Sequence, residues 1–364
     1  MKINLVMIVK DEERSLERCL KSAKALVDDM IIVDTGSSDR TIEIAERMGA
    51  RVKRFTWVND FSAARNFALD QSDGDWNLVL DGDEYLRKCS RKRLEDILSG
   101  RKGMWLGGIT RYDSYQDQDG ISISTSVIPR LLPKGVRYIG KIHEQPEEKY
   151  PFYSVYLEAD HDGYLYGDKG ERNLSYLELA AAEYPDDGYY QFQLAFTLRN
   201  LKRLEESLPY FRRFYQLTSC HTAYWGEGVV LYLYTLLDLG EAGHLDEAER
   251  IVNQEEGTLG NWPDFCFVCG IFYMKRVLSD VGRYIGFLPN IEQYYLKCLE
   301  LGERPETGGV VGTGSFKAAY NLGAWYEVSG QIELADKYYR MAAKDGYKPA
   351  LKRLEEGEFR KQTG

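Results

Sequence analysis

Short apolar runs alternate with amphipathic stretches in the first part of the chain. Residues 3–9, 30–33 and 76–80 are almost wholly apolar and predict buried strands. Between them, apolar residues recur at spacings of three and four, which is typical of helices with one buried face. This alternation predicts βαβ units arranged around a mostly parallel sheet.

Small and polar residues mark the expected helix ends. Ser15 precedes an apolar stretch of helical spacing and is predicted to cap the first helix. The polar run 34–41 is expected to turn into the second helix, with Ser38 or Asp39 as its cap, and Gly49 is placed to end it. A further strand is predicted at 52–55 and a further helix at 61–69.

The pattern changes after about residue 104, where short β-rich pieces are separated by Gly and Pro. We expect later, partly antiparallel strands that complete the same domain. The predicted strands are residues 105–110, 121–128, 138–142 and 153–157.

The second half of the chain is helical and repetitive. Apolar and small residues of the segment 194–214 recur at the same spacing in the segment 322–342. This recurrence predicts the helix-turn-helix array of tetratricopeptide repeats. Residues 232–252 fit a third copy, and residues 272–299 fit a fourth copy with an insertion at 282–290. Residues 173–184 are expected to form an opening helix.

Charge and hydropathy exclude two classes of protein. The 57 acidic residues outnumber the 47 basic ones, for a net charge of −10, which argues against nucleic acid as the main partner. No apolar run approaches the ~18 residues of a membrane span, and the apolar N-terminus lacks the features of a signal peptide, so we expect no stable membrane insertion. The six cysteines are scattered, and Cys266 and Cys269 are expected to be buried thiols. These features predict a cytoplasmic protein.

The strand 76–80 ends in a pair of carboxylates, Asp81 and Asp83. Open α/β sheets bind ligands at the ends of such strands. Two aspartates one residue apart can reach one divalent cation, whose other ligands often come from a diphosphate. The pair therefore predicts a site for a metal and a nucleotide diphosphate. The first strand is not followed by a dinucleotide-binding glycine motif, and the Gly-rich segment 308–315 lacks a phosphate-loop ending and is expected to link two helices.

Several motifs occur together with this pair, in a fixed order. The chain is similar to family 2 glycosyltransferases with the Rossmann-like GT-A fold. It resembles in particular the bacterial subgroup fused to tetratricopeptide repeats, which includes sublancin-type peptide S-glycosyltransferases. The motifs that carry the resemblance are Ile8–Glu13, Val33–Thr41, Asn59–Asn66, Leu80–Glu84, Gly140–Glu144, His161–Tyr164 and Glu171–Asn173.

The resemblance implies an α/β GT-A catalytic domain over residues 1–170 and an all-α tetratricopeptide-repeat-like domain over residues 171–364. It further implies an inverting hexosyltransferase that uses a UDP-sugar donor and Mg²⁺ or Mn²⁺. The motif of processive synthases is absent, so one sugar per encounter is expected.

The resemblance also assigns roles to individual residues. Asp34 matches the position that contacts uridine, and Lys10 and Glu12 border the same pocket. Arg65 matches a basic position near the diphosphate. Asp81 would bind ribose, or the metal through water, and Asp83 would bind the metal directly.

The catalytic base is the least constrained assignment, because the acidic pair common in the family is not evident. Glu144 is the first choice, with Asp113, Asp117 and Asp119 as rivals. His143 beside it is expected to act as a further metal ligand or to contact the acceptor, and a structural role for His143 and for His161 stays open.

The acceptor is expected to be a Cys, Ser or Thr side chain of a peptide or protein. A cell-surface glycan, a lipid-linked acceptor, or a catalytically inactive repeat scaffold are the alternatives. The repeats would either hold the acceptor or support the catalytic domain or a homodimer. Tyrosines that would line an acceptor groove are Tyr189, Tyr190, Tyr224, Tyr232 and Tyr234.

Overall fold

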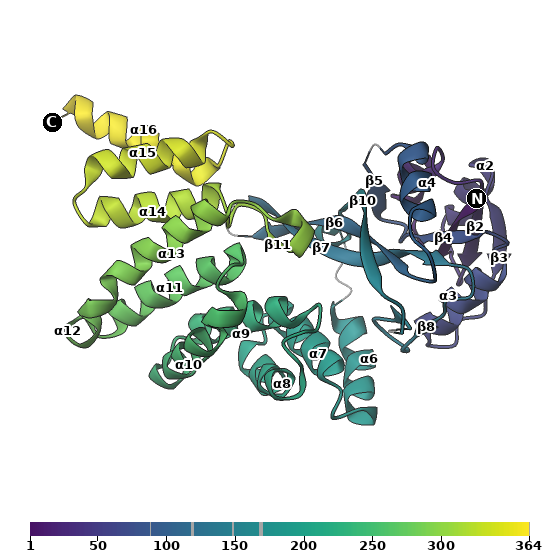
Figure 1. Cartoon of the computed structure of the whole chain (residues 1–364), viewed down its shortest axis with the longest axis horizontal. Helices are drawn as coiled ribbons and strands as arrows, with labels where there is room; N and C mark the ends of the chain where they lie inside the picture. Colours follow the sequence, from purple (N-terminus) through teal and green to yellow (C-terminus); the bar gives the residue numbers. More distant parts are fainter. Residues whose placement is uncertain (88, 118–119, 148, 167–169, 364) are drawn as a thin grey trace. The chain divides into compact units, whose positions relative to one another are not determined.

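The computed structural model describes residues 1–87, 89–117, 120–147, 149–166 and 170–363. The chain divides into two compact units, labelled by their elements in Figure 1. The first unit comprises Met1–Gln116 and Ile123–Lys169, and the second comprises Asp117–Ser122 and Gly170–Gly364. The boundary near residue 170 coincides with the change of pattern in the sequence, whereas a short internal segment groups with the helical unit.

A mixed sheet forms the centre of the first unit, and its strands there follow the order β3-β2-β1-β4-β7-β6-β10-β5. Strands β3, β2, β1 and β4 are parallel to one another, as the alternation of strands and helices predicts. Beyond β4, the pairs β4–β7 and β5–β10 are antiparallel and the pair β6–β10 is parallel. The strands are β1 (Ile3–Val9), β2 (Asp29–Asp34), β3 (Arg51–Arg54), β4 (Trp76–Val79), β5 (Glu84–Leu86), β6 (Leu106–Asp117), β7 (Gly120–Pro133) and β10 (Phe152–His161).

Helices cover both faces of this sheet. The helices α1 (Leu16–Ala23), α2 (Thr41–Arg47) and α4 (Arg91–Ser99) contribute to a core with alternate residues of β1, such as Leu5 and Met7. The helix α3 (Phe61–Asp70) packs against the other face, where Val6 lies. Alternate residues of one strand therefore serve two cores.

The end of one strand and the cap of one helix differ from the expectation. Strand β6 continues to Asp117, past the predicted end at residue 110, because its later inward-facing residues are polar: Asp113 is buried and its partner Arg111 is half-buried. Ser15 precedes α1 but makes no capping bond to it, since its hydroxyl donates to Glu12 Oε2 at 2.7 Å. A small second sheet pairs β8 (Tyr138–Ile139) with β9 (Gln145–Pro146).

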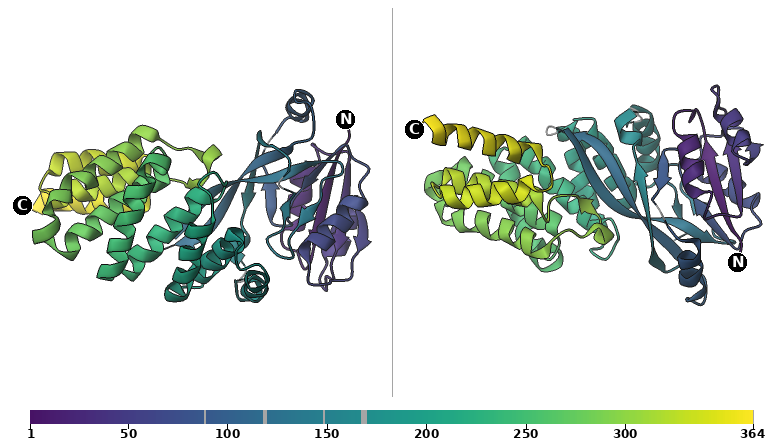
Figure 2. Two further views of the ribbon diagram at one scale, coloured as in Figure 1. Left: turned by 60° about the horizontal axis from the view of Figure 1, so that its bottom comes forward. Right: turned by 90° about the horizontal axis from the view of Figure 1, so that it is seen from above.

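The second unit consists of consecutive helices that pack in pairs, as the repeats predict (Figures 1 and 2). The insertion at 282–290 forms a short helix and a 3₁₀ turn within the third pair, and the glycine-rich segment links two helices through the short strand β11 (Gly309–Val310). The pairs are α7 (Gly188–Asn200) with α8 (Leu204–Leu217), α9 (Trp225–Leu239) with α10 (Ala242–Leu259), α11 (Pro263–Ser279) with α13 (Leu288–Leu301), and α14 (Phe316–Val328) with α15 (Ile332–Ala343). Helix α6 (Gly170–Glu183) precedes them and α16 (Lys348–Thr363) follows.

The tyrosines of this unit contribute mainly to contacts between helices. Tyr232 is 2% exposed, stacks on Phe211, and its hydroxyl bonds to Glu247 of the next helix. Tyr224 stacks on Phe192 with ring centroids 5.5 Å apart. Tyr189, Tyr190 and Tyr234 are half-buried. The expected tyrosine-rich groove is therefore at most partial among the described residues.

The cysteines of α11 are buried free thiols, as expected, and burial raises the pKa of Cys266 to about 11. None of the helices in the described part of the chain is long and apolar enough to cross a bilayer.

Candidate active site

The parallel strands β1, β2 and β4 bring their carboxyl ends to one edge of the sheet. Val9 at the end of β1 is in register with Asp34 at the end of β2, and β4 runs parallel beside β1. The residues that follow these ends therefore gather at the edge where open α/β sheets bind ligands. Strand β2 brings Asp34 to this edge, and the turn after β4 brings Asp81 and Asp83 there.

The loops after β1 and β2 are held to each other by hydrogen bonds. The buried Asp34 carboxylate accepts from Gly36 N at 3.0 Å and from Ser37 N at 3.1 Å, which fixes the turn after β2. Glu12 N donates to Thr41 Oγ1 at 2.7 Å, and a side chain at Gly82 would collide with that of Glu12. Glu12 thus lies against the turn that carries the two aspartates, whereas Lys10 is exposed.

Asp81 is neutralised by two arginines. Arg65 Nη2 donates to Asp81 Oδ1 at 2.5 Å, and Arg130 Nη2 donates to Asp81 Oδ2 at 2.5 Å. Burial alone would raise the pKa of Asp81, but Arg130 and Arg65 hold it well below its usual range. Asp81 is therefore a fixed anion whose two oxygens already have charged partners.

The same arginines extend the ion pairs in both directions. Arg65 Nε donates to Glu144 Oε1 at 2.9 Å, so the predicted base and Asp81 contact the same guanidinium group. Arg130 Nη2 also bonds to Glu84 Oε1 at 2.5 Å. Glu84 is fully buried, accepts from Arg111 Nη1 at 3.2 Å, and bonds back to Asp81 N at 3.1 Å.

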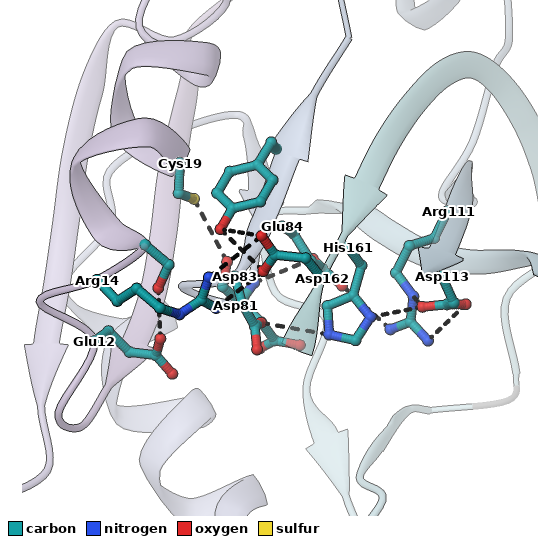
Figure 3. Close-up of polar contacts among 12 residues, drawn as sticks. Glu12, Arg14, Cys19, Asp81, Asp83, Glu84, Arg111, Asp113, His161 and Asp162 are labelled. Carbon is teal, nitrogen blue, oxygen red and sulfur yellow. Dashed lines mark hydrogen bonds and ion pairs between the residues drawn. The ribbon is translucent and has the colours of Figure 1, made fainter. Parts of the chain in front are cut away.

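The chain of ion pairs ends at Asp83, through Asp113 and His161 (Figure 3). Arg111 Nε lies 2.7 Å from Asp113 Oδ1, and the same oxygen lies 2.7 Å from His161 Nδ1. His161 Nε2 lies 3.6 Å from Asp83 Oδ1. Strand register explains this meeting, because His161 at the end of β10 pairs with Asp113 of β6 on one side and with Glu84 of β5 on the other.

The surroundings of His161 favour its charged form when no cation is bound. Burial opposes protonation, but the hydrogen bonds to Asp113 and Asp83 outweigh it and raise the pKa of His161 to about 9. Asp113 shows the complementary effect: burial opposes ionisation, yet His161 and Arg111 lower its pKa.

Asp83 and His161 fit a metal ion. Asp83 Oδ1 and His161 Nε2 lie 3.6 Å apart, and a carboxylate oxygen and an imidazole nitrogen this close would both be able to hold the same ion. Gly163 leaves the space beside both groups open, since a Cβ there would collide with the Asp83 carboxylate and with His161 Nε2. With His161 neutral, as a metal ligand has to be, five carboxylates (Asp81, Asp83, Glu84, Asp113, Glu144) against three guanidinium groups (Arg65, Arg111, Arg130) leave two negative charges, which a divalent cation would balance.

The structure does not gather the expected trio of metal ligands. Among the described residues, no three His, Cys, Asp or Glu side chains form a group that could hold a metal. Asp81 is engaged by arginines, and the imidazole beside Asp83 is that of His161, not His143. His143 precedes Glu144 with a left-handed φ of 49°, and burial lowers its pKa to about 4, which keeps its ring neutral.

The rivals for the base are placed differently. Asp113 is 5% exposed and already holds His161 and Arg111. Asp117 lies 3.8 Å from Lys317 Nζ, within the second unit. Asp119 lies outside the described residues.

Sequence reasoning missed the roles of Arg130 and Arg111 and left that of His161 open. One signal was available: Arg130 stands between Ile128 and the apolar pair Leu131 and Leu132 in a β-rich run. A lone cation in a buried strand requires a carboxylate partner. Which carboxylate it meets depends on the pairing of β4 with β7, which the sequence does not specify.

Comparison with known proteins bears on this arrangement. The sequence model of the family described as Glycosyl transferase family 2 matches residues 5–151. Residues 5–151 form a family 2 glycosyltransferase domain. That range of the glycosyltransferase domain contains Asp34, Arg65, Asp81, Asp83 and Glu144, whereas His161 lies beyond it.

Individual relatives agree with this assignment over parts of the chain. The SPbeta prophage-derived glycosyltransferase SunS of Bacillus subtilis is 25% identical over 218 residues, 57% of this chain and 51% of its own length. An uncharacterized glycosyltransferase of Rickettsia bellii is 34% identical over 131 residues, 36% of this chain and 42% of its own. A TPR repeat-containing protein of Synechococcus elongatus is 54% identical over 84 residues, 23% of this chain and 21% of its own. The chain thus spans about half or less of these relatives, and combines the glycosyltransferase domain with tetratricopeptide-like repeats.

Proposed function

We propose that this protein transfers a hexose from a UDP-sugar to a side chain of a peptide or protein, with inversion and with a divalent cation. The single observation that carries the proposal is the meeting of Asp83 and His161 at the carboxyl edge of a family 2 glycosyltransferase domain. A carboxylate and an imidazole placed side by side at this edge suit a cation that bridges to a diphosphate.

The diphosphate also has a protein partner in this proposal. Arg65 is 6% exposed, and its Nη1 is a buried donor with no hydrogen-bond partner among the described atoms. A buried guanidinium donor is costly to leave unsatisfied. A diphosphate oxygen would satisfy it, and Asp81 and Glu144 hold the rest of the guanidinium in place. Asp34 and Glu12, on the loops beside the site, are proposed to contact the nucleoside, with Lys10 at the rim.

The metal would be held by Asp83 and His161, and when bound it would supply positive charge at the departing diphosphate oxygen. His161 is oriented for this through its Nδ1 bond to Asp113. Mg²⁺ and Mn²⁺ are both compatible with a site made of one carboxylate, one imidazole, substrate and water.

Glu144 is proposed to accept the proton of the attacking hydroxyl or thiol. Its Oε1 is held by Arg65, so its side chain has a fixed position near the residues proposed to hold the donor. The neutral His143 beside it is proposed to contact the acceptor.

A donor screen and one substitution test the proposal. A bound ligand must raise the melting temperature, so a panel of nucleotide sugars with and without Mn²⁺ should identify a UDP-sugar that stabilises the protein only together with the metal. Asp83→Asn should abolish this metal-dependent shift and the transfer, while the melting temperature without ligand changes little.

Asp160→Asn is the matched control, because Asp160 is a carboxylate on β10 whose partner is Arg87, outside the site. A wild-type protein indifferent to chelator, or an active Asp83→Asn variant, would refute the metal-dependent reading. Stabilisation by no nucleotide sugar at all would remove the donor assignment.

A further inference from the structure

We propose that Asp113 is a positioning residue of the metal site, not a catalytic base: it holds His161 with Nδ1 protonated so that Nε2 faces Asp83. The inference rests on the proposed function and deepens it. It assigns a role to a carboxylate that the sequence alone leaves among the rivals for proton acceptance.

Both carboxylate oxygens of Asp113 already have partners within the protein. Oδ1 lies 2.7 Å from His161 Nδ1 and 2.7 Å from Arg111 Nε. Oδ2 accepts from Arg111 Nη2 and from Ser126 Oγ, each at 3.3 Å. The carboxylate thus has three partner residues, His161, Arg111 and Ser126, and because Asp113 is only 5% exposed it cannot reach a substrate proton.

The effect on His161 follows from the chemistry of imidazole. A neutral imidazole has one N–H and one lone pair, and the partner of the first nitrogen decides which nitrogen keeps the lone pair. Because Asp113 accepts at Nδ1, the lone pair stays on Nε2, the atom 3.6 Å from Asp83 Oδ1. Carboxylates that bind metal-ligating histidines in this way raise metal affinity and fix ring orientation.

Two further contacts hold this arrangement in place. Arg111 joins Asp113 to Glu84, the residue that follows Asp83 in the chain. On the other side, Asp162 accepts from Arg14 Nη2 at 2.9 Å and from the Tyr85 hydroxyl at 3.1 Å, which anchors the residue after His161. Contacts to the imidazole ring and contacts to the next residue, Asp162, thus both hold His161 in place.

The test measures Mn²⁺ binding to the full chain by the electron paramagnetic resonance signal of free Mn²⁺. Asp113→Asn keeps the shape of the side chain but offers an amide that can donate to Nδ1, so the dissociation constant for Mn²⁺ should rise about 10- to 100-fold. Transfer by this variant should recover at saturating Mn²⁺, because the affinity for the metal is the property that is impaired. Asp160→Asn should bind Mn²⁺ like the wild type.

A double-variant cycle separates positioning from general damage. If Asp113 acts through His161, then Asp113→Asn should have no added effect on Mn²⁺ affinity in a His161→Ala background. Equal losses in both backgrounds, or unchanged Mn²⁺ affinity in Asp113→Asn, would overturn the inference. A loss of transfer that excess Mn²⁺ does not restore, with Mn²⁺ affinity intact, would return Asp113 to the role of base.

Asp113→Glu serves if the Asn variant does not fold, since it keeps the charge opposite Arg111 but displaces the carboxylate from Nδ1. It should weaken Mn²⁺ binding in the same direction, and unchanged affinity would count against the inference. Failure of wild-type protein to bind Mn²⁺ at all would instead overturn the proposed function, and with it this inference.

Discussion

Arg65, which is proposed to bind the diphosphate of the donor, also contacts Glu144, the residue proposed to take the acceptor proton. Its guanidinium bonds to Asp81 at 2.5 Å and to Glu144 at 2.9 Å, and it is almost fully buried. A change at Glu144 removes one contact of Arg65, and the contact with Asp81 still holds Arg65 in place. This makes the proton-accepting role of Glu144 separable from donor binding.

Glu144→Gln should lower kcat about 100-fold or more, the usual effect of removing a positioned base, while the KM for the donor changes little. The amide oxygen of Gln can still accept from Arg65 Nε, so the donor side of the site should stay ordered. Steady-state kinetics with the donor varied at saturating acceptor gives both constants.

The assignment fails if the Gln variant keeps its rate while Asp117→Asn loses it. A thiol acceptor would reduce the effect, because part of the thiol ionises unaided near pH 8. The comparison is therefore sharpest with a hydroxyl acceptor.

At the residue scale, the sequence predicted the identities of the acidic residues better than their partners. Asp81, Asp83 and Glu144 stand in recognisable motifs, and the structure brings Asp81 and Glu144 together through Arg65. Arg130 and Arg111 stand in no motif and act through long-range pairs with Asp81 and Glu84. Contacts between residues 27 to 49 positions apart depend on strand order, which local pattern does not encode.

Among the elements, the glycine-rich segment after α13 shows how a linker can depend on a single buried group. Asp264, at the start of α11, is 6% exposed and accepts from Val310 N at 2.7 Å and from Thr313 Oγ1 at 3.0 Å. Gly309 has a φ of +126°, and a Cβ there would collide with the Asp264 carboxylate. The segment thus wraps closely around one acidic side chain, and burial raises the pKa of Asp264 to about 7.

This raised pKa predicts a stability that falls as pH rises. Between about pH 4 and pH 7 the unfolded chain releases the proton while the folded chain keeps it, so the contribution is present below about pH 4 and is lost as pH rises to about 7. A difference of about three pKa units corresponds to roughly 4 kcal/mol. Asp264→Asn cannot ionise, and Thr313 can reverse its hydroxyl to accept from the amide.

The measurement is the free energy of unfolding in urea for wild type and Asp264→Asn at pH 4, 5.5 and 7.5. The difference between the two proteins isolates Asp264 from carboxylates with lowered pKa values, such as Asp113, whose contributions have the opposite slope. The variant should gain on the wild type as pH rises. A difference that stays constant over this range would show that Asp264 is ionised in the folded protein.

The helices and strands were predictable from the sequence where their buried residues are apolar. Strands β1, β2 and β4 and helix α3 follow their apolar runs to within a few residues, because most of the buried residues in those runs are apolar and pack into the two cores. The end of β6 was not predicted, since the buried residue in its later part is Asp113, which forms an ion pair with the half-buried Arg111. Buried ion pairs hide a strand from any method that reads hydropathy alone.

At the scale of the whole molecule, we expect the repeats to bind the polypeptide acceptor. Stacked helix pairs form extended surfaces that suit a peptide better than a monosaccharide. Tyr232 packs between helices and is not available to an acceptor. The surface that binds the acceptor therefore lacks at least this one of the five tyrosines expected from the sequence.

A chain truncated after Gly170 tests this division. It should still bind the sugar nucleotide and hydrolyse it slowly, and it should lose transfer to a peptide acceptor. Isothermal titration with the donor and transfer assays on the same preparation give both results, with circular dichroism as the control for folding. Full transfer by the folded truncated chain would show that the repeats serve assembly or stability.

The six residues Asp117–Ser122 belong to the helical unit although they interrupt the glycosyltransferase half of the chain. Within that unit, Lys317 Nζ bonds to Ser122 Oγ at 3.1 Å and lies 3.8 Å from Asp117. A gene fusion that joined these repeats to another transferase near residue 170 would therefore remove the contacts of Lys317 with Ser122 and Asp117. An exchange of the repeats between relatives should therefore keep these contacts only if residues 117–122 move together with residues 170–364.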